Sequence, residues 1–369
     1  MGNRDQYYMQ QAIMLAQKAR GQTSPNPMVG AVVVKEGRIV GQGYHQQAGK
    51  PHAEVLALRE AGEKARGATL YVNLEPCSHQ GQTPPCTEMI IDRGLSRVVA
   101  AMVDPNPRVS GEGLAQLQEA GIEVSCGVLS KRAARLNEVF IKYITTGLPF
   151  VYLKGAMSLD GKIATWTGDA RWITSDRARE NLHHLRHEVD SILVGRGTVA
   201  ADDPLLTTRL PQGGGRDSLR VILDSSLSLA ADYKIFNLDD GLTVLAVAEG
   251  SLEEGRAEPF LKQGVRVIEL PEKQGRVDLS SLLRWLGKAS YTSLLVEGGS
   301  QVHASFVEQG LADRLMLYVA PRIIGGSEAY PLVGGRGFSS VEEAVELDNL
   351  QVKRIGCDLL ISGYFRRRD

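Results

Sequence analysis

Three residues in the first hundred could together bind a metal ion. His52 is followed by two cysteines, Cys77 and Cys86, each directly preceded by a proline. One imidazole and two thiolates suit zinc, and three protein ligands leave a fourth position open, as in catalytic zinc sites. Zinc lowers the pKa of a water molecule bound at such a position. The residue types therefore predict one catalytic Zn²⁺ ion per chain.

Glu54 lies two residues after His52, at the start of a helix that we predict for residues 53–62. Both side chains can reach a site in front of the helix N-terminus, where a carboxylate can carry protons between the activated water and a leaving amine. This pattern, His-x-Glu followed by Pro-Cys and a second cysteine, is typical of zinc-dependent nucleobase deaminases. The alternative is a structural zinc ion, for which His79 would be the candidate fourth ligand.

The elements around these residues predict an α/β domain. A helix over 6–20 ends before Ser24-Pro25-Asn26-Pro27, and a hairpin follows at 29–35 and 38–43. Strands at 68–74, 97–103 and 122–126 then alternate with helices at 53–62, 87–93 and 114–120, and one helix covers 129–146. Such alternation favours a largely parallel sheet, and ligands collect where its strands end.

The pattern restarts after Gly147-Leu148-Pro149, so we place the domain boundary there, giving domains 1–147 and 148–369. The second domain is expected to contain strands at 150–156, 191–195, 220–224, 243–248, 265–269, 293–296, 314–320 and a pair within 350–364. Helices are expected at 175–187, within 277–287 and at 300–309. Glu297-Gly298-Gly299-Ser300 joins a strand to a helix, where backbone N–H groups suit a diphosphate. A plain turn is the alternative interpretation.

Two stretches carry a resemblance to a known family. Eight residues separate the cysteines in the segment from Pro76 to Cys86, and the second domain opens with Met157-Ser158-Leu159-Asp160-Gly161-Lys162-Ile163-Ala164. The chain resembles the bifunctional riboflavin-biosynthesis deaminase-reductases over nearly its whole length. The resemblance implies an α/β fold, with an N-terminal cytidine-deaminase-like three-layer sandwich and a C-terminal domain like dihydrofolate reductase.

The resemblance also implies two reactions. In the first, zinc-bound hydroxide deaminates 2,5-diamino-6-(5-phosphoribosylamino)pyrimidin-4(3H)-one. In the second, NADPH reduces the ribosyl chain of 5-amino-6-(5-phosphoribosylamino)uracil to its ribityl form. The positions that match the deaminase substrate contacts of the family are Asn26, His45, His79, Asp104 and Asn106. Gln82 stands where some relatives have a lysine.

For the reductase, the positions that match NADPH contacts are Ala156, Trp172, Thr198, Asp202, Gly299, Ser300, Gln301, Val302, His303, Ala304 and Ser305. Those that match substrate contacts are Ala170, Arg186, Leu206, Arg209 and Glu297, to which we add Lys154. The guanidinium pair Arg186 and Arg209 is suited to a phosphate. Lys154, Asp202 and Glu297 are candidates for protonating the ring oxygen, although Asp202-Asp203-Pro204 could equally form a turn.

Composition narrows the function further. The 369 residues carry 42 basic and 43 acidic side chains, which excludes the basic surplus of a general nucleic-acid binder. The chain has no apolar stretch long enough to cross a membrane and no secretion signal, so we expect a cytoplasmic protein. Cys126 and Cys357 are predicted to be buried free thiols, as suits that compartment.

Two other functions are compatible with the metal motif, and a histidine pair elsewhere has the spacing of metal ligands. A zinc nucleobase deaminase acting on RNA or DNA, fused to a reductase-like domain, would share the metal motif. So would a non-enzymatic binding module stabilised by zinc. His183 and His187 are four residues apart on a predicted helix, but we interpret them, with His184, as a solvated or interdomain face and not as metal ligands. The expected partners are a small phosphoribosyl-pyrimidine and, by resemblance, further copies in a homo-oligomer, dimer or tetramer.

Overall fold

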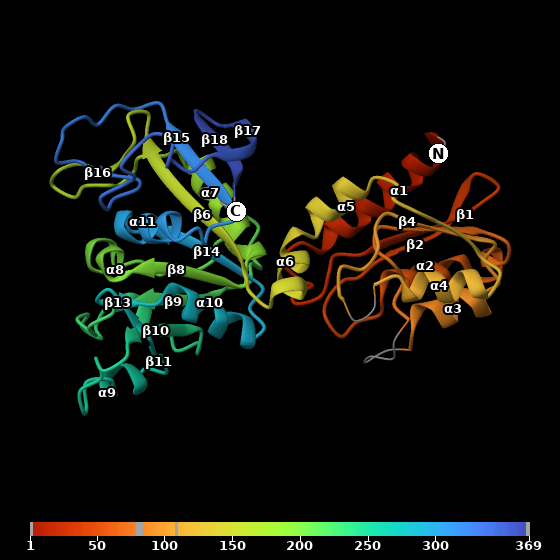
Figure 1. The fold of residues 1–369 in the computed structure, drawn as a ribbon, viewed down its shortest axis with the longest axis horizontal. Coiled ribbons are helices and arrows are strands. Elements are labelled where there is room, and N and C mark those ends of the chain that lie inside the picture. The colour runs from red at the N-terminus through yellow and green to blue at the C-terminus, as the bar shows by residue number, and fades with distance from the viewer. Residues whose placement is uncertain (1–2, 79–83, 108–109, 367–369) are drawn as a thin grey trace. The chain divides into compact units, whose positions relative to one another are not determined.

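A computed structural model describes residues 3–78, 84–107 and 110–366 of the chain (Figure 1). The chain divides into two compact units, Met1–Gly147 and Leu148–Asp369. Each unit has its own sheet and its own apolar core. No helix within the described ranges is both long and apolar enough to cross a membrane.

The first unit is built on a five-stranded sheet in the order β2-β1-β3-β4-β5. Its strands are β1 (Gly30–Lys35), β2 (Arg38–Tyr44), β3 (Thr69–Val72), β4 (Arg97–Ala100) and β5 (Glu123–Cys126). β1 pairs antiparallel with both β2 and β3, whereas β3, β4 and β5 run parallel. The last residues of β3 and β4 therefore meet at one edge, from which the chain leaves the sheet.

Helices cover both faces of this sheet (Figure 1). They are α1 (Asn3–Ala16), α2 (Ala53–Ala61), α3 (Cys86–Asp92), α4 (Glu112–Glu119), α5 (Ser130–Leu136) and α6 (Glu138–Thr146), with short 3₁₀ turns at Gln17–Ala19 and Gly62–Ala65. Val32 packs with α1 and α5, and its neighbour Val33 packs with α2, α3 and α4. Because successive strand side chains point to opposite faces, both faces are buried and the unit is a three-layer sandwich.

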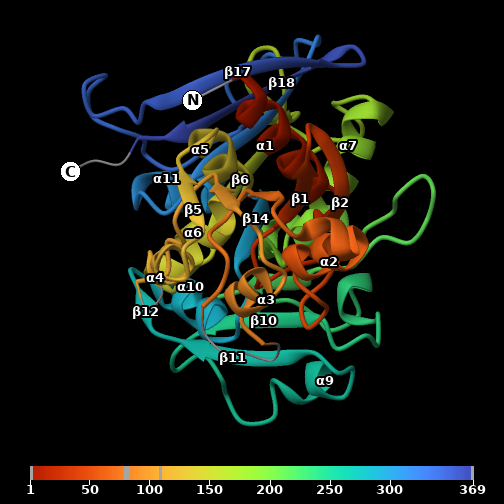
Figure 2. The same ribbon diagram turned by 90° about the vertical axis from the view of Figure 1, so that its right-hand side faces the viewer.

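The second unit has a nine-stranded sheet, with β11 at one edge and β17 at the other (Figure 2). The strands, in sheet order, are β11 (Arg266–Leu270), β10 (Thr243–Ala248), β9 (Leu219–Leu223), β8 (Ser191–Gly195), β14 (Ser293–Gly298), β6 (Phe150–Ser158), β15 (Arg314–Ala320), β18 (Asp358–Phe365) and β17 (Leu347–Ile355). All neighbours from β11 to β15 are parallel, whereas β18 pairs antiparallel with both β15 and β17.

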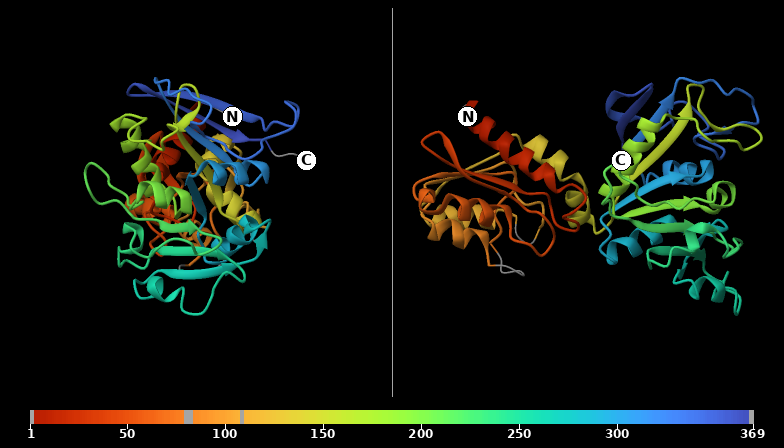
Figure 3. Two further views of the ribbon diagram at one scale, coloured as in Figure 1. Left: turned by 90° about the vertical axis from the view of Figure 1, so that its left-hand side faces the viewer. Right: turned by 180° about the vertical axis from the view of Figure 1, so that it is seen from behind.

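The helices of the second unit also lie on both faces of its sheet (Figure 3). One face packs against α10 (Leu279–Lys288) and α11 (Ser300–Glu308). The other packs against α7 (Asp176–Glu188), α8 (Arg196–Asp202) and α9 (Glu258–Leu261). The remaining elements are β7 (Lys162–Ala164), β12 (Glu272–Lys273), β13 (Arg276–Val277), β16 (Tyr330–Pro331) and a 3₁₀ turn at Lys234–Phe236.

The helix predicted over 129–146 is wrong in one respect, because the chain forms two helices that break at Asn137. The Asn137 backbone has φ −104° and ψ 23°. Its buried side chain accepts from Met28 N at 2.8 Å and donates to Met28 O at 3.0 Å. The apolar pattern continues through the break, so a pairing with a residue far away in sequence decides where the first helix ends.

The predicted strands over 68–74 and 97–103 are also too long, since β3 ends at Val72 and β4 at Ala100. The residues that follow leave the sheet and form loops. The prediction of buried thiols is wrong for Cys357, which is exposed in the turn between β17 and β18, and Cys126 is half-buried at the end of an edge strand.

Replacement of Asn137 tests the role of this buried amide. We expect Asn137→Ala to lower the free energy of unfolding of the first unit by about 1–3 kcal/mol. The reason is that Met28 N loses its acceptor, whereas Met28 O keeps a second donor, Asn73 Nδ2 at 2.9 Å. Urea-dependent hydrogen exchange on peptides of the first unit, within the full chain, measures the change.

The control is Gln118→Ala on the exposed face of α4, which should change stability by less than about 0.5 kcal/mol. Equal effects of the two substitutions would show that the Asn137 contacts do not stabilise the fold.

Candidate active sites

The three predicted metal ligands converge beside the edge where β3 ends. His52 Nδ1 lies 3.2 Å from Cys86 Sγ and 3.5 Å from Cys77 Sγ, and all three donor atoms lie within 4.8 Å of one another. A tetrahedral zinc ion, with bonds of ~2.0 Å to nitrogen and ~2.3 Å to sulfur, separates such donors by ~3.6 Å. The three side chains are therefore spaced as ligands of a single metal ion would be.

Two helix N-termini bring these donors together. His52 is the N-cap residue of α2 in an extended conformation, and Cys86 is the first residue of α3, after Pro85. Hydrogen bonds from the Cys86 thiol and from His52 hold the pKa of Cys77 well below its usual range. The pKa of Cys86 is raised because its proton is shared with Cys77. A metal ion would take the place of that proton, since thiols that ligate a metal are deprotonated.

Glu54 is buried in the first turn of α2, next to this cluster. Burial, with a smaller contribution from Cys77, raises the pKa of its carboxyl group to about 7. Within the described protein, Glu54 Oε2 is buried without a hydrogen-bond partner. An unpaired buried carboxylate is costly, so this oxygen marks a place where a ligand that carries protons can bind. A pKa near neutrality suits a group that both takes up and releases a proton.

Two of the predicted substrate residues lie together beside the metal ligands. His45 Nδ1 is 3.3 Å from Pro51 O, and His45 Nε2 is 3.2 Å from Asn26 Nδ2. The rings of His45 and His52 meet edge to face with centroids 5.5 Å apart. Burial lowers the pKa of His45, which favours the neutral ring. Nδ1 of a neutral ring can then donate to the carbonyl while Nε2 accepts from Asn26, so the amide has a fixed orientation.

Asp104 and Asn106 lie on the loop that follows β4. Asn106 N donates to Asp104 Oδ1 at 2.8 Å, and Asp104 N donates to Glu75 Oε2 at 2.9 Å. Sequence reasoning missed Glu75, although it directly precedes the Pro76-Cys77 pair that identified a ligand. The predicted substrate residue His79, together with Gln82, lies outside the described residues.

In the second unit, a buried ion pair lies where β14 ends. Arg186 Nε and Nη2 contact the two Glu297 carboxylate oxygens at 2.6 and 2.7 Å, and Arg186 Nη1 donates to Thr207 O at 3.0 Å. The side chains are 9% and 5% exposed. Burial acts to raise the pKa of Glu297, but Arg186 outweighs it and the pKa falls below 4.5. Glu297 therefore stays ionised and is a poor proton donor.

Lys154 comes from the neighbouring strand β6 and interacts electrostatically with both Glu297 and Arg186. Burial lowers its pKa, an effect that Glu297 opposes and Arg186 reinforces. Its Nζ lies 5.9 Å from the centre of the Tyr318 ring. Lys154 is half-buried, and an ammonium group with a lowered pKa gives up its proton more readily than a lysine in water.

The predicted nucleotide-binding residues gather where the adjacent parallel strands β8 and β14 end. Each strand leads directly into a helix, α8 or α11. A methyl group at Gly298 would stand 3.3 Å from Thr198 Oγ1, so the two helix starts lie side by side. Arg171 contacts both the Asp202 carbonyl and its carboxylate, and the neighbouring Trp172 is 60% exposed with Arg179 4.3 Å from its ring centre.

Not every residue of the predicted stretch 299–305 faces outward. His303 and Ala304 are buried, and His303 Nδ1 lies 3.1 Å from Leu332 O. Gly299, Ser300, Gln301, Val302 and Ser305 are exposed or half-buried. A ligand at this helix can therefore meet side chains from one face only, as helical periodicity requires. Ala156 is half-buried on β6, on the same strand face as Lys154.

A pocket of about 500 Å³ opens beside the ion pair. It is lined by Trp172, Asp176, Arg179, Glu180, Leu182, His183, Arg186, Arg209 and Pro211. Arg186 and Arg209, the guanidinium pair predicted from the sequence, thus line one pocket. Of the other predicted substrate residues, Ala170 is half-buried, and Leu206 is buried in the core with a φ of 51°.

His183 and His187 are half-buried and hydrogen-bonded, so the interpretation as a solvated face is wrong, whereas the interdomain alternative stays a prediction. His183 Nδ1 accepts from Arg209 N at 3.2 Å, and His187 Nδ1 accepts from Arg216 N at 3.0 Å. Burial lowers the pKa of both rings, that of His183 to about 4, so they remain neutral acceptors. The two histidines lie one turn apart on α7 and hold residues 209–216, the segment that carries Arg209, against this helix.

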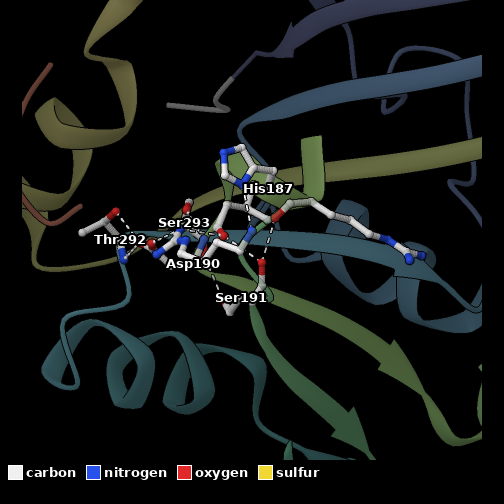
Figure 4. Close-up of polar contacts among 9 residues, drawn as sticks. His187, Asp190, Ser191, Thr292 and Ser293 are labelled. Carbon is white, nitrogen blue, oxygen red and sulfur yellow. Dashed lines mark hydrogen bonds and ion pairs between the residues drawn. The ribbon is translucent and has the colours of Figure 1, made fainter. Parts of the chain in front are cut away.

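The far end of that segment is fixed by a buried polar network (Figure 4). Arg216 Nη2 donates to Asp190 Oδ1 at 3.0 Å, and Asp190 Oδ2 accepts from Thr292 N and Oγ1 at 2.8 and 2.7 Å. Ser191 Oγ donates to Ser293 O at 2.7 Å, which joins the starts of β8 and β14. The network therefore stabilises the sheet at the end opposite the candidate site.

Fold and site together define a zinc-type deaminase joined to a reductase. Residues 2–102 match the cytidine and deoxycytidylate deaminase zinc-binding region, and residues 149–361 match the RibD C-terminal domain. Because the second match covers more than half of the chain, and full-length relatives agree, the chain belongs to the RibD family of bifunctional riboflavin biosynthesis enzymes. The predicted fold class is confirmed.

Relatives and solved structures extend over nearly the whole chain. The riboflavin biosynthesis protein RibD of Aquifex aeolicus is 46% identical over 98% of both chains. RibD of Acinetobacter baumannii is 37% identical, with a TM-score of 0.89 over 99% of both chains. A deaminase-reductase of Thermotoga maritima is 38% identical, with a TM-score of 0.83 over 98% of this chain and 99% of that one. The likeness therefore includes both units.

Removal of the buried cation tests the Arg186–Glu297 pair. We expect Arg186→Met to destabilise the second unit by about 3–5 kcal/mol, because it leaves the Glu297 carboxylate buried without its partner. Urea-dependent hydrogen exchange on peptides of the second unit measures the loss.

Arg284→Met is the matched control, since the Arg284 side chain is 59% exposed and its contact with Asp278 is worth at most about 1 kcal/mol.

The Arg186–Glu297 pair also predicts that stability depends on pH. The pKa of Glu297 is lower in the folded than in the unfolded chain, so its stabilisation is complete above the unfolded value and is lost as pH falls through the folded one. If the stability of the second unit in the parent protein did not fall at acid pH, Glu297 would not be the stabilising carboxylate that we infer.

Proposed function

We propose that residues 1–147 form a zinc-dependent pyrimidine deaminase domain and residues 148–369 an NADPH-dependent reductase domain. The first would deaminate 2,5-diamino-6-(5-phosphoribosylamino)pyrimidin-4(3H)-one, and the second would reduce the ribosyl chain of 5-amino-6-(5-phosphoribosylamino)uracil. The observation that carries the proposal is the convergence of His52, Cys77 and Cys86 beside an unpaired, buried Glu54. The Thermotoga maritima relative is described as a diaminohydroxyphosphoribosylaminopyrimidine deaminase and 5-amino-6-(5-phosphoribosylamino)uracil reductase, which supports these substrates.

In the deaminase, His52, Cys77 and Cys86 would hold one Zn²⁺ per chain, and a bound zinc ion would supply an activated water. Glu54 takes up a proton on its free oxygen and delivers it to the departing nitrogen, which leaves as ammonia. Asn26, oriented by His45, is placed to donate to and accept from a pyrimidine edge. His79, Asp104 and Asn106 complete the proposed substrate contacts.

In the reductase, NADPH would supply hydride to the sugar carbon bonded to nitrogen. The accessible residues of the proposed cofactor set are Ala156, Trp172, Thr198, Asp202, Gly299, Ser300, Gln301, Val302 and Ser305. Lys154 donates the proton that the ring oxygen needs as the ring opens. Support for Lys154 over Glu297 and Asp202 comes from its burial beside the ion pair, because Glu297 is held ionised and Asp202 lies at the surface against Arg171.

The substrate phosphate is proposed to bind in the pocket lined by Arg186 and Arg209. Three of the five Arg186 N–H groups are used by Glu297 and Thr207, which leaves two for a ligand. Arg209 Nη1 donates to Thr207 Oγ1 at 2.6 Å and keeps its other N–H groups for phosphate. Leu206 would contact the substrate through its backbone, as would Ala170.

The competing functions receive less support. A nucleic-acid deaminase would need a basic surface, whereas the chain carries a net charge of −1 and its relatives are riboflavin biosynthesis proteins. A zinc-stabilised binding module would not need an unpaired buried carboxylate beside the metal. The homo-oligomeric state and the cytoplasmic location stay predictions.

One experiment tests both reactions together. The chain is incubated with the diaminopyrimidine ribotide and NADPH while ammonia release and NADPH oxidation are followed, with single-stranded RNA as the competing substrate. We expect ammonia first and NADPH oxidation only after deamination. If ammonia were released from RNA but not from the diaminopyrimidine ribotide, the proposed substrate would be rejected.

The role of Glu54 predicts a separation of metal binding from catalysis. Glu54→Gln should keep the zinc content and lose about 10²–10⁴-fold in deamination rate, because the amide cannot transfer the proton. Zinc per chain is measured by elemental analysis and turnover by ammonia release.

Two cysteine variants serve as controls for the metal. Cys86→Ser should lose zinc, whereas Cys126→Ser, a half-buried thiol outside the cluster, should keep it. Near-normal deamination by Glu54→Gln would show that another residue transfers the proton.

The role of Lys154 predicts a second separation. Lys154→Met should lower the reduction rate by about 10²–10⁴-fold while deamination in the other domain stays unchanged. Lys353→Met, an exposed lysine on β17, is the matched control. NADPH affinity, measured by fluorescence titration, should be similar in all three proteins.

The pH profile distinguishes the two possible roles of this lysine. The pKa of Lys154 lies below its usual value of 10.5, and the proton donor is the ammonium form. The reduction rate at saturating substrate should therefore fall as pH rises through that lowered pKa, and Lys154→Met should lack this step. A rate that rises with pH at the same step would identify Lys154 as a base.

A further inference from the structure

Glu75 is a buried carboxylate that neither proposed reaction uses. It lies three residues beyond the end of β3 and two residues before Cys77. Four backbone N–H groups from another part of the chain donate to it. Gly113 N and Leu114 N contact Oε1 at 2.7 and 3.3 Å, and Asp104 N and Gly111 N contact Oε2 at 2.9 and 3.0 Å.

One of its oxygens caps a helix that has no cap of its own. The N-cap residue of α4 is Gly111, with φ 85° and no side chain to accept from the first turn. Oε1 of Glu75 instead accepts hydrogen bonds from Gly113 N and Leu114 N in the first turn. A negative charge at a helix N-terminus is also favourable, because it interacts with the helix dipole. A methyl group at Gly113 would stand 2.1 Å from Pro76 O, so α4 packs against the chain beside Glu75 at backbone distance.

The other oxygen holds both Asp104, at the start of the loop that leads to α4, and Gly111, at its end. Asp104 N donates to Oε2, and the Asp104 side chain in turn accepts from Asn106 N. Glu75 N donates to Met102 O at 3.0 Å, which adds a backbone contact to the same loop. A single side chain thus ties both ends of the loop with Asp104 and Asn106 to the segment that leads to Cys77.

We propose that Glu75 is a positioning residue of the deaminase, which sets the distance between the loop of Asp104 and Asn106 and the metal ligand Cys77. A carboxylate has about four acceptor positions, and backbone donors fill all of them, so Glu75 itself is not available to substrate. The inference rests on the proposed deaminase function, since it assumes that Asp104 and Asn106 contact the substrate.

Glu75→Gln is the most direct test, because it keeps the shape but leaves one oxygen for two pairs of donors. Whichever way the amide turns, its NH₂ group faces backbone N–H groups, and one donor pair loses its acceptor, either Asp104 and Gly111 or Gly113 and Leu114. We expect KM for the diaminopyrimidine ribotide to rise about 10- to 100-fold, with kcat per bound zinc changed much less. NADPH oxidation by the reductase domain should be unchanged and reports on the integrity of the chain.

The control is Glu119→Gln, the same chemical change at an exposed position of α4, which should leave KM unaltered. Glu75→Asp keeps the charge and should recover part of the lost KM. If Glu75 only stabilised the fold, Glu75→Gln would lower zinc content and kcat together and leave KM alone, and that result would overturn the proposal.

Hydrogen exchange supplies a measurement that does not depend on the substrate. In Glu75→Gln, the amides of at least one donor pair, either Asp104 and Gly111 or Gly113 and Leu114, should exchange at least about tenfold faster than in the parent, whereas Glu119→Gln should leave all four unchanged. Unchanged exchange in Glu75→Gln would overturn the proposal even if the parent released no ammonia. Absence of ammonia release from the parent, with faster exchange in the variant, would reject the proposed substrate and leave Glu75 as the residue that positions the loop.

Discussion

Loops at the ends of parallel strands must satisfy backbone N–H groups that have no partner in the sheet, and buried side chains do this throughout the molecule. In the first unit, the chain leaves β3 and β4 at the same edge. Asn73 accepts from Gly30 N at 2.7 Å, Asn137 accepts from Met28 N, and Glu75 accepts from the loop before α4. The cost of an unpaired buried donor makes each of these contacts specific. The two loops that flank the predicted metal ligands are therefore fixed to one backbone segment, residues 73–77.

The second unit uses charged and aromatic acceptors for the same purpose. His183 and His187 accept backbone N–H groups from the segment that carries Arg209, and Arg186 reaches the Thr207 carbonyl of that segment. Because both imidazoles are neutral and half-buried on one face of α7, they orient the segment without adding charge to the pocket. The positive charge that faces the pocket comes from the arginines alone.

The sequence was sufficient for features that depend on local pattern or on chemistry. Alternation of strands and helices predicted both sheets, and residue type and spacing singled out His52, Glu54, Cys77 and Cys86. The sequence did not predict the roles of residues whose partners lie far away along the chain. Asn137 breaks a helix because it pairs with Met28, which no local propensity reveals, and His183 meets Arg209 only after folding. Glu75 was visible beside Pro76-Cys77, but its four donors come from residues 104–114, so its role could not be deduced from the motif.

Two buried carboxyl groups, one in each unit, have pKa values shifted in opposite directions by their surroundings. Glu54 has no cationic partner for its free oxygen, and burial raises its pKa to about 7, so it can exchange a proton near neutral pH. Glu297 is equally hidden, but Arg186 contacts both of its oxygens and keeps it ionised. Since a carboxylate that is always ionised can orient a ligand but cannot acidify it, our proposal assigns proton transfer in the second unit to another group. Lys154 feels the charge of Glu297 and has its pKa lowered by burial, which is the combination that such a donor requires.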